Sequence, residues 1–167
     1  MARQLWLLRH AEAEPHGTRP DAQRLLTARG ERQARVAGIA IARLGATFDE
    51  VLYSPKERAA RTATLAAEAW SAEQRALLRE HAALAGGFDA AGALEALAGI
   101  SGRHERVLLV GHEPDLSQTA GELSGGRVDL KKGGLAVVRL ESTRGELAVL
   151  MRPRELALIA GLPLDGD

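Results

Sequence analysis

Two histidines each follow an apolar run, and this repeated arrangement is the clearest chemical signal in the sequence. Leu5–Leu8 leads into Arg9 and His10, and Arg106–Val110 reaches His112 through a single glycine. Apolar runs of this length predict strands buried on both faces. In open α/β sheets, ligands bind outside the carboxyl ends of the strands. We therefore expect the two imidazoles to face one another over one pocket.

Arginines accompany these histidines at Arg9, Arg24 and Arg58. Arg58 falls on the first turn of an expected helix, where free backbone N–H groups and the positive dipole end also attract anions. A planar guanidinium binds two phosphate oxygens at once. A neutral imidazole can attack phosphorus while arginines stabilise the equatorial oxygens. The set therefore predicts phosphoryl transfer through a histidine, with the second imidazole protonated, and it suggests no metal cage. Arg19 and Arg29 compete with Arg24 for its role.

Hydrophobic periodicity predicts strands alternating with helices along the chain. We expect strands over residues 4–8, 51–53, 76–78, 106–110, 135–140 and 147–151, and helices over 28–44, 55–70, 90–100, 113–124 and 152–160. This alternation predicts an α/β fold, a three-layer α/β/α sandwich with a mostly parallel sheet and an antiparallel edge hairpin. We expect one domain over residues 1–167.

Two helix starts are marked by capping residues. Thr27 can cap the first helix. Ser54 is expected to cap the second, with Pro55 at the first helical position and Glu57 completing a capping box. On that second helix Arg61 lies four residues after Glu57, which predicts an exposed ion pair.

Composition excludes several classes of function. The chain has 167 residues, with 22 basic and 22 acidic side chains and no cysteine. A net charge of zero gives no argument for nucleic acid or an anionic membrane as partner. Without cysteine there are no disulfides, thiolate nucleophiles or Cys-based zinc sites. No apolar run approaches the ~20 residues of a membrane span, and Met1–Gln4 lacks a signal-peptide pattern, so we expect a cytoplasmic location.

Three motifs, in order, resemble those of the histidine phosphatase (phosphoglycerate-mutase-like) superfamily. They are Leu8-Arg9-His10-Ala11-Glu12, Ser54-Pro55-x-x-Arg58-Ala59-x-x-Thr62 and Val110-Gly111-His112-x-Pro114. Their spacing and the short chain are most similar to the SixA-type phosphohistidine phosphatases, which lack large lid insertions. The segment Arg24-Leu25-Leu26-Thr27 also resembles that branch. The resemblance covers roughly residues 5–150.

The resemblance implies specific roles. His10 would be the catalytic nucleophile that becomes transiently phosphorylated. Arg9, Arg24 and Arg58 would hold the phosphoryl group, and His112 would be the second imidazole of the pocket. No cofactor or metal is implied, and the partner would be a phosphorylated protein or a small phosphorylated substrate.

The sequence departs from the family pattern in two places. Ala11 stands where the family usually has glycine, and we expect little effect from one methyl group. Many members carry an acidic proton donor after the third strand, but the matching segment here, Ala83–Gly87, has no acid. Glu80 lies three residues earlier and is the remaining candidate. Because general acid catalysis contributes ~10²–10⁴-fold to a reaction with a poor leaving group, the missing acid favours a labile donor such as phosphohistidine.

The sequence thus predicts a metal-independent phosphohistidine phosphatase acting through His10. A small-molecule phosphomonoesterase or mutase of the same superfamily is one alternative. A non-catalytic module that binds phosphorylated partners is the other. The sequence does not name the physiological substrate, the preferred phosphohistidine isomer or the oligomeric state.

Overall fold

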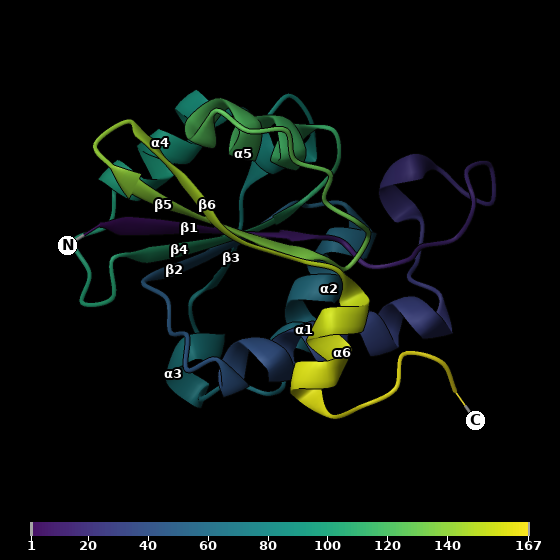
Figure 1. Ribbon diagram of the computed structural model, residues 1–167. Coiled ribbons are helices and arrows are strands. Elements are labelled where there is room, and N and C mark those ends of the chain that lie inside the picture. Colours follow the sequence, from purple (N-terminus) through teal and green to yellow (C-terminus); the bar gives the residue numbers. More distant parts are fainter. Residues whose placement is uncertain (1, 167) are drawn as a thin grey trace.

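One six-stranded sheet organises the protein in this computed structural model, which describes residues 2–166 (Figure 1). Across the sheet the strands follow the order β3-β2-β4-β1-β5-β6. The first four pair in parallel, whereas β5 and β6 are antiparallel. The strand bounds are β1 (Arg3–Arg9), β2 (Glu50–Tyr53), β3 (Leu78–Glu80), β4 (Arg106–Gly111), β5 (Leu135–Glu141) and β6 (Arg144–Met151). The expected mostly parallel sheet with an antiparallel edge hairpin is confirmed.

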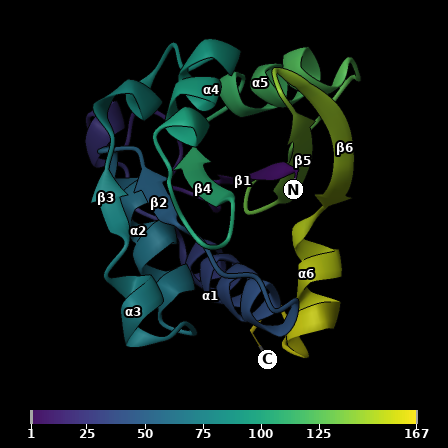
Figure 2. The ribbon, with the colours of Figure 1, turned by 90° about the vertical axis from the view of Figure 1, so that its left-hand side faces the viewer.

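Helices cover both faces of this sheet. Figures 1 and 2 show α4 and α5 on one face and α1, α2, α3 and α6 on the other. Their bounds are α1 (Ala28–Arg43), α2 (Glu57–Ala67), α3 (Ala72–Arg75), α4 (Ala90–Ala98), α5 (Asp115–Ser124) and α6 (Pro153–Ala160). The architecture is therefore the expected three-layer α/β/α arrangement. Among the described residues, no helix is both long enough and apolar enough to cross a membrane.

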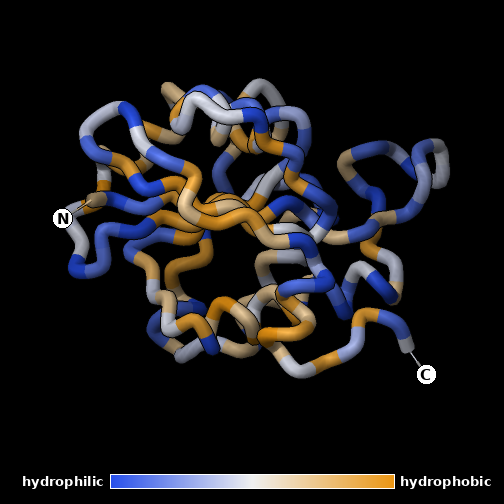
Figure 3. Tube along the Cα trace, in the orientation of Figure 1, coloured by the Kyte–Doolittle hydropathy of each residue, from blue (hydrophilic) through white to orange (hydrophobic). Residues whose placement is uncertain are grey.

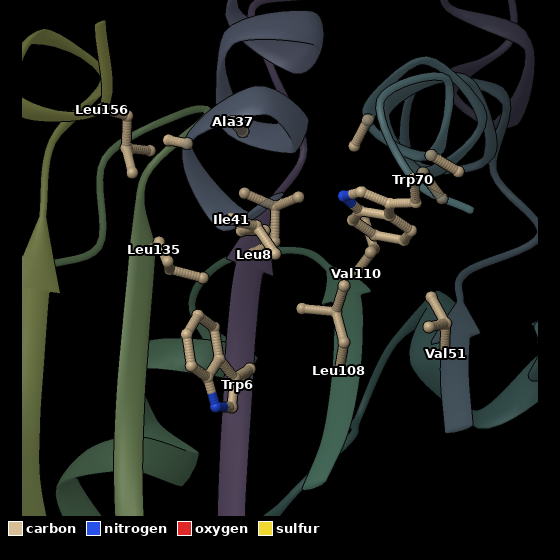
Figure 4. Packing of buried hydrophobic residues seen from close by; sticks show 14 of the residues in the cluster. Trp6, Leu8, Ala37, Ile41, Val51, Trp70, Leu108, Val110, Leu135 and Leu156 are labelled. Atoms are coloured by element: carbon tan, nitrogen blue, oxygen red, sulfur yellow. The ribbon is translucent and has the colours of Figure 1, made fainter. Parts of the chain in front are cut away.

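The two layers of core follow from the alternation of side chains along β1. Trp6 and Leu8 point towards α1, α2 and α6, while Leu5 and Leu7 point towards α4 and α5. Figure 4 shows Trp6 and Leu8 in the first layer beside Ile41 of α1. Figure 3 shows hydrophobic residues concentrated along the central strands, with hydrophilic residues on the outer turns. Because each fully buried leucine contributes about 2 kcal/mol of transfer free energy, β1 is strongly held at the centre of the sheet.

Close contact between α1 and α2 depends on a glycine. A Cβ added at Gly38 would lie 1.9 Å from the backbone oxygen of Ala66. The indole Nε1 of Trp70 also donates a hydrogen bond to the oxygen of Gly38, at 3.0 Å. The second helix is thereby held against the first, which determines where its amino-terminal end lies.

Register places the ends of two central strands side by side. β1 and β4 pair with Leu8 opposite Val110 and Arg9 opposite Gly111. The residue that follows each strand is therefore a histidine at the same edge of the sheet. The segment 10–27 leaves this edge and projects beyond it before α1 begins (Figure 1).

Thr27 caps α1 as expected, since its side chain accepts a hydrogen bond from the nitrogen of Gly30. The capping box at Ser54 is wrong: α2 begins after Lys56, which makes no side-chain cap bond. The expected Arg61–Glu57 pair is also wrong, because Arg61 Nε lies 3.2 Å from Glu31 Oε1 on α1.

Some expected boundaries shift as well. The third strand begins at Leu78 rather than residue 76, because the short helix α3, capped by Ser71, occupies the preceding residues. β6 begins at Arg144, three residues before the expected start, because the turn before it is tight and centres on Ser142 with a φ of 66°.

Candidate active site

His10 leaves the end of β1 with one ring nitrogen hydrogen-bonded and the other turned towards an arginine. Its Nδ1 lies 2.8 Å from the backbone oxygen of Ala11. A carbonyl can only accept, so Nδ1 carries the proton and Nε2 keeps its lone pair. Arg58 Nε donates to Nε2 at 3.4 Å. This tautomer gives His10 a nucleophilic nitrogen at Nε2.

Burial keeps the His10 ring neutral. The side chain is 6% exposed, and its burial lowers the pKa to about 3, with nearby His112, Arg58 and Arg9 adding to the effect. A group with this pKa is uncharged at pH 7. His10 can therefore act as a nucleophile without first losing a proton.

His112, at the end of β4, lies against His10. The two ring centroids are 5.1 Å apart. Its Nε2 lies 2.7 Å from Ser54 Oγ, which in turn accepts from the nitrogen of Lys56 at 3.2 Å. The Ser54 hydroxyl still has a proton that it can donate to Nε2, and in that arrangement the His112 proton lies on Nδ1.

The expectation of a protonated His112 is wrong for these surroundings. Burial, the largest cause, and the cations of Arg58 and Lys56 together lower its pKa to about 4. The ring is therefore neutral at pH 7, with a single N–H to offer.

Two of the expected arginines converge on a carboxylate that sequence reasoning missed, that of Asp21. Arg24 Nη2 lies 3.0 Å from Asp21 Oδ1, and Arg58 Nη2 lies 3.3 Å from Asp21 Oδ2. Lys56 Nζ is 3.1 Å from Asp21 Oδ2. The hydrogen bond from Lys56 and those from the arginines hold the pKa of Asp21 far below its usual range. Asp21 is therefore an ionised partner of the cations, and it cannot hold a proton for acid catalysis near pH 7.

Arg9 also lines the site. Its Nη1 donates to the backbone oxygen of Leu130 at 2.9 Å. Its Nε and the Nδ1 of His112 are both buried without a hydrogen-bond partner among residues 2–166. Buried donors of this kind are costly unless they are paired. Both residues line the same pocket, so an anion bound there could accept from Arg9 Nε and, where Nδ1 carries the proton, from His112.

One pocket of about 420 Å³ joins these groups. It contains all five residues expected from the sequence, and four further charged or titratable side chains to which the sequence prediction assigned no site role. The lining residues are Arg9, His10, Ala13, Glu14, Pro15, His16, Arg24, Arg58, His112, Glu113 and Lys132. Glu113 directly follows His112 in the sequence, so its position beside a motif histidine was a usable signal. Glu14, in the loop after His10, and Lys132, in a lysine pair before the fifth strand, gave weaker signals, because charges in such loops are more often simply solvated.

Three sequence candidates lie elsewhere. Glu80 is exposed and lines a separate pocket that shares no residue with this one. Arg19 pairs with Glu14, and Arg29 pairs with Asp165, so neither competitor of Arg24 reaches the pocket lining. Within residues 2–166, no three histidine or carboxylate side chains gather in a way that could hold a metal ion.

Comparison with known proteins agrees with this geometry. Residues 5–85 match the histidine phosphatase superfamily (branch 1). An uncharacterised protein of Picosynechococcus sp. is 30% identical over 169 residues, covering 92% of this chain and 98% of the relative. The chain belongs to the histidine phosphatase superfamily, branch 1.

Solved structures of this superfamily share the fold closely. A candidate phosphohistidine phosphatase SixA from Nakamurella multipartitia is 26% identical, with a TM-score of 0.76 over 92% of this chain and 97% of that one. The protein histidine phosphatase SixA complexed with tungstate has a TM-score of 0.78 at 22% identity, covering 92% and 99% of the two chains. A candidate α-ribazole-5'-P phosphatase of Escherichia coli K-12 has a TM-score of 0.71 at 22% identity, covering 91% and 98%. This histidine phosphatase superfamily phosphatase is thus SixA-like in structure.

Proposed function

We propose that this phosphatase hydrolyses phosphohistidine on a partner protein, through a covalent phosphate on His10. The observation that carries the proposal is the state of the His10 ring: Nδ1 donates to a carbonyl, and a neutral Nε2 lies in a pocket with three arginines. A fixed, unprotonated nucleophile beside preorganised cations is what phosphoryl transfer requires.

In the first step, Nε2 of His10 attacks phosphorus and a new P–N bond forms. The P–N bond of the substrate breaks, and its electron pair stays on the nitrogen of the leaving imidazole. Arg58 and Arg24 would turn from Asp21 towards the equatorial oxygens, and Arg9 Nε and His112 Nδ1 would donate to them. These donors would stabilise the negative charge on the equatorial oxygens in the transition state.

In the second step, water attacks phospho-His10. The new P–O bond forms as the P–N bond breaks, the electron pair returns to Nε2, and the water proton leaves with phosphate or to solvent. No step calls on a metal ion.

Two features support phosphohistidine over an alkyl ester. The acid-free segment at residues 83–87 and the position of Glu80 outside the pocket leave no proton donor of the usual family kind. An alkoxide leaving group needs such a donor, whereas an imidazole already protonated at its other nitrogen leaves as a neutral molecule.

The test is chemical trapping with a phosphohistidine-bearing protein as substrate and a chelator present throughout. Rapid quenching in alkali, followed by mass spectrometry, should find phosphate on His10 during turnover. His10→Ala should be inactive, whereas His104→Ala, a histidine outside the pocket, should retain wild-type activity. Turnover without phosphate on His10 would overturn the mechanism. Faster turnover of alkyl phosphates than of phosphohistidine would favour a small-molecule phosphatase, and tight phosphate binding without turnover would favour a binding module.

A further inference from the structure

Glu113 is the one pocket carboxylate with an oxygen left for a ligand. Its Oε1 accepts a hydrogen bond from the nitrogen of Ser117 at 3.0 Å. Within the described chain, no other hydrogen bond or ion pair involves this side chain. The first turn of α5 therefore holds the carboxylate in place while Oε2 stays unpartnered.

Two other carboxylates, Glu14 in the pocket lining and Asp21 beside the pocket arginines, already have partners at both oxygens. Both oxygens of Glu14 bond to Arg19, and one of them also accepts from the nitrogen of Leu25. Both oxygens of Asp21 face cations. A ligand N–H at either carboxylate would therefore share its oxygen with donors already bound, whereas Oε2 of Glu113 has no such competitor among the described residues.

Exposure separates the pocket into a floor and a rim. His10, Arg24, Arg58 and His112 are each at most 7% exposed and form the floor. Glu113 is half-buried, so it lies nearer to solvent. A phosphoryl group bound to the floor must carry its leaving group on the solvent side, because buried side chains close the other.

We propose that Glu113 binds the N–H of the leaving imidazole and thereby selects phosphohistidine in its protonated form. This inference rests on the proposed function and names the substrate group that the rim recognises. A phosphorylated imidazole carries its proton on the ring nitrogen that is not bonded to phosphorus. A carboxylate that accepts this N–H favours the charged ring. When the P–N bond breaks, its electron pair neutralises the ring, the proton stays in place, and Glu113 remains ionised throughout.

Positively charged side chains share the pocket with Glu113 and affect how it would bind an imidazole. Arg9, Lys132 and His112 line the pocket with Glu113, and its negative charge raises the pKa of the Arg9 guanidinium against the lowering by burial. The negative charge of Glu113 therefore offsets the nearby positive charges, which would otherwise repel a protonated imidazole. Without Glu113, the pocket would bind protonated phosphohistidine less well, and this is the form whose imidazole leaves most easily.

The experiment compares Glu113→Gln with wild type on three substrates: a phosphohistidine peptide, p-nitrophenyl phosphate and an alkyl phosphate. Glutamine keeps an oxygen for the Ser117 nitrogen but loses the charge. The expected result is a loss in kcat/KM of about 10- to 100-fold on phosphohistidine, the range for a charged hydrogen bond, with less than about threefold loss on p-nitrophenyl phosphate. The alkaline limb of kcat on phosphohistidine should also move to lower pH, because the bound imidazole then loses its proton more easily.

Glu122→Gln, an exposed change on the helix α5 that follows Glu113, is the matched control and should leave all three rates unchanged. Equal losses on all substrates would overturn the inference, since Glu113 would then act on the floor rather than on the leaving group. A loss greatest on the alkyl phosphate would also overturn it, because Glu113 would then be a proton donor. Thermal unfolding of each variant separates these outcomes from misfolding. If the wild type does not hydrolyse phosphohistidine at all, the proposed function itself is wrong, and the wild-type measurement alone shows this.

Discussion

The hydroxyl of Ser54, at the end of β2, lies 2.7 Å from Nε2 of His112, at the end of β4. Both residues are buried, at 0% and 7% exposure. The contact joins two parallel strands at the edge where the pocket opens. A residue that looks like a helix cap in the sequence instead orients one of the two imidazoles.

Ser54→Ala tests this contact. The His112 ring would lose the side-chain hydrogen bond that holds it in one orientation. We expect kcat on phosphohistidine to fall by about tenfold, the effect of one hydrogen bond, with little change in KM. Ser71→Ala removes the cap of α3; it should lower stability by about 1 kcal/mol and leave kcat intact. A Ser54→Ala enzyme with wild-type kcat would show that packing alone orients His112.

The two buried histidines predict the acid side of the activity profile. The pKa of His10 is lowered to about 3, mainly by burial, and that of His112 to about 4. The nucleophile therefore stays unprotonated well below the ordinary histidine pKa of about 6.5. We expect the enzyme to lose less than half of its kcat/KM between pH 7 and pH 5.5, measured with a substrate whose own ionisation is known. An acid limb centred near 6.5 would contradict a neutral, buried His10.

The same shifts have a consequence for stability. Each folded-state pKa is below its unfolded value, so the unfolded chain binds more protons as the pH falls, and stability decreases. The contribution is fully present above about pH 6.5 and is lost as the pH falls towards 4 and then 3. Denaturant unfolding at several pH values should therefore show a smaller loss for the double variant His10→Gln/His112→Gln than for wild type. Parallel curves would exclude these histidines as the cause.

Asp21 competes with the substrate for cations. Its carboxylate pairs with Arg24, Arg58 and Lys56. Asp21→Asn removes one negative charge from the group that would hold phosphate. Because the Asp21 side chain is 46% exposed, screening keeps the effect modest, and we expect inorganic phosphate to bind about two- to fivefold more tightly. Isothermal titration calorimetry measures this, with Asp165→Asn as a control of equal charge change on an exposed partner of Arg29. Weaker binding by Asp21→Asn would show that the carboxylate mainly orients the arginines.

The contact between α1 and α2 leaves no room for a side chain at Gly38. Because an added Cβ would meet the Ala66 oxygen at 1.9 Å, Gly38→Ala should lower the free energy of unfolding by about 2–3 kcal/mol. At Gly99 the nearest atoms would be 3.6 Å away, so Gly99→Ala should change it by no more than about 0.5 kcal/mol. Urea denaturation compares the two. Similar stability of both variants would mean that the helices can separate without cost.

Much of this protein is determined by its sequence alone. The unbroken apolar runs before His10 and His112 predict central strands, since only a strand covered on both faces buries every residue. Thr27 marks the start of α1 because its oxygen accepts from the first turn. The local pattern therefore predicts the three layers and the mostly parallel sheet. The sequence motifs also indicate the five residues that line one pocket, which are Arg9, His10, Arg24, Arg58 and His112.

The partners of those residues are decided only by tertiary structure. Ser54 bonds to His112 across 58 positions of sequence, and Asp21 reaches Arg58 across 37. No periodicity encodes such distances, because they depend on the β1–β4 register and on how the 10–27 segment folds over the sheet edge. The protonation of both histidines depends on the same packing, since burial, which no single position reveals, sets their pKa values.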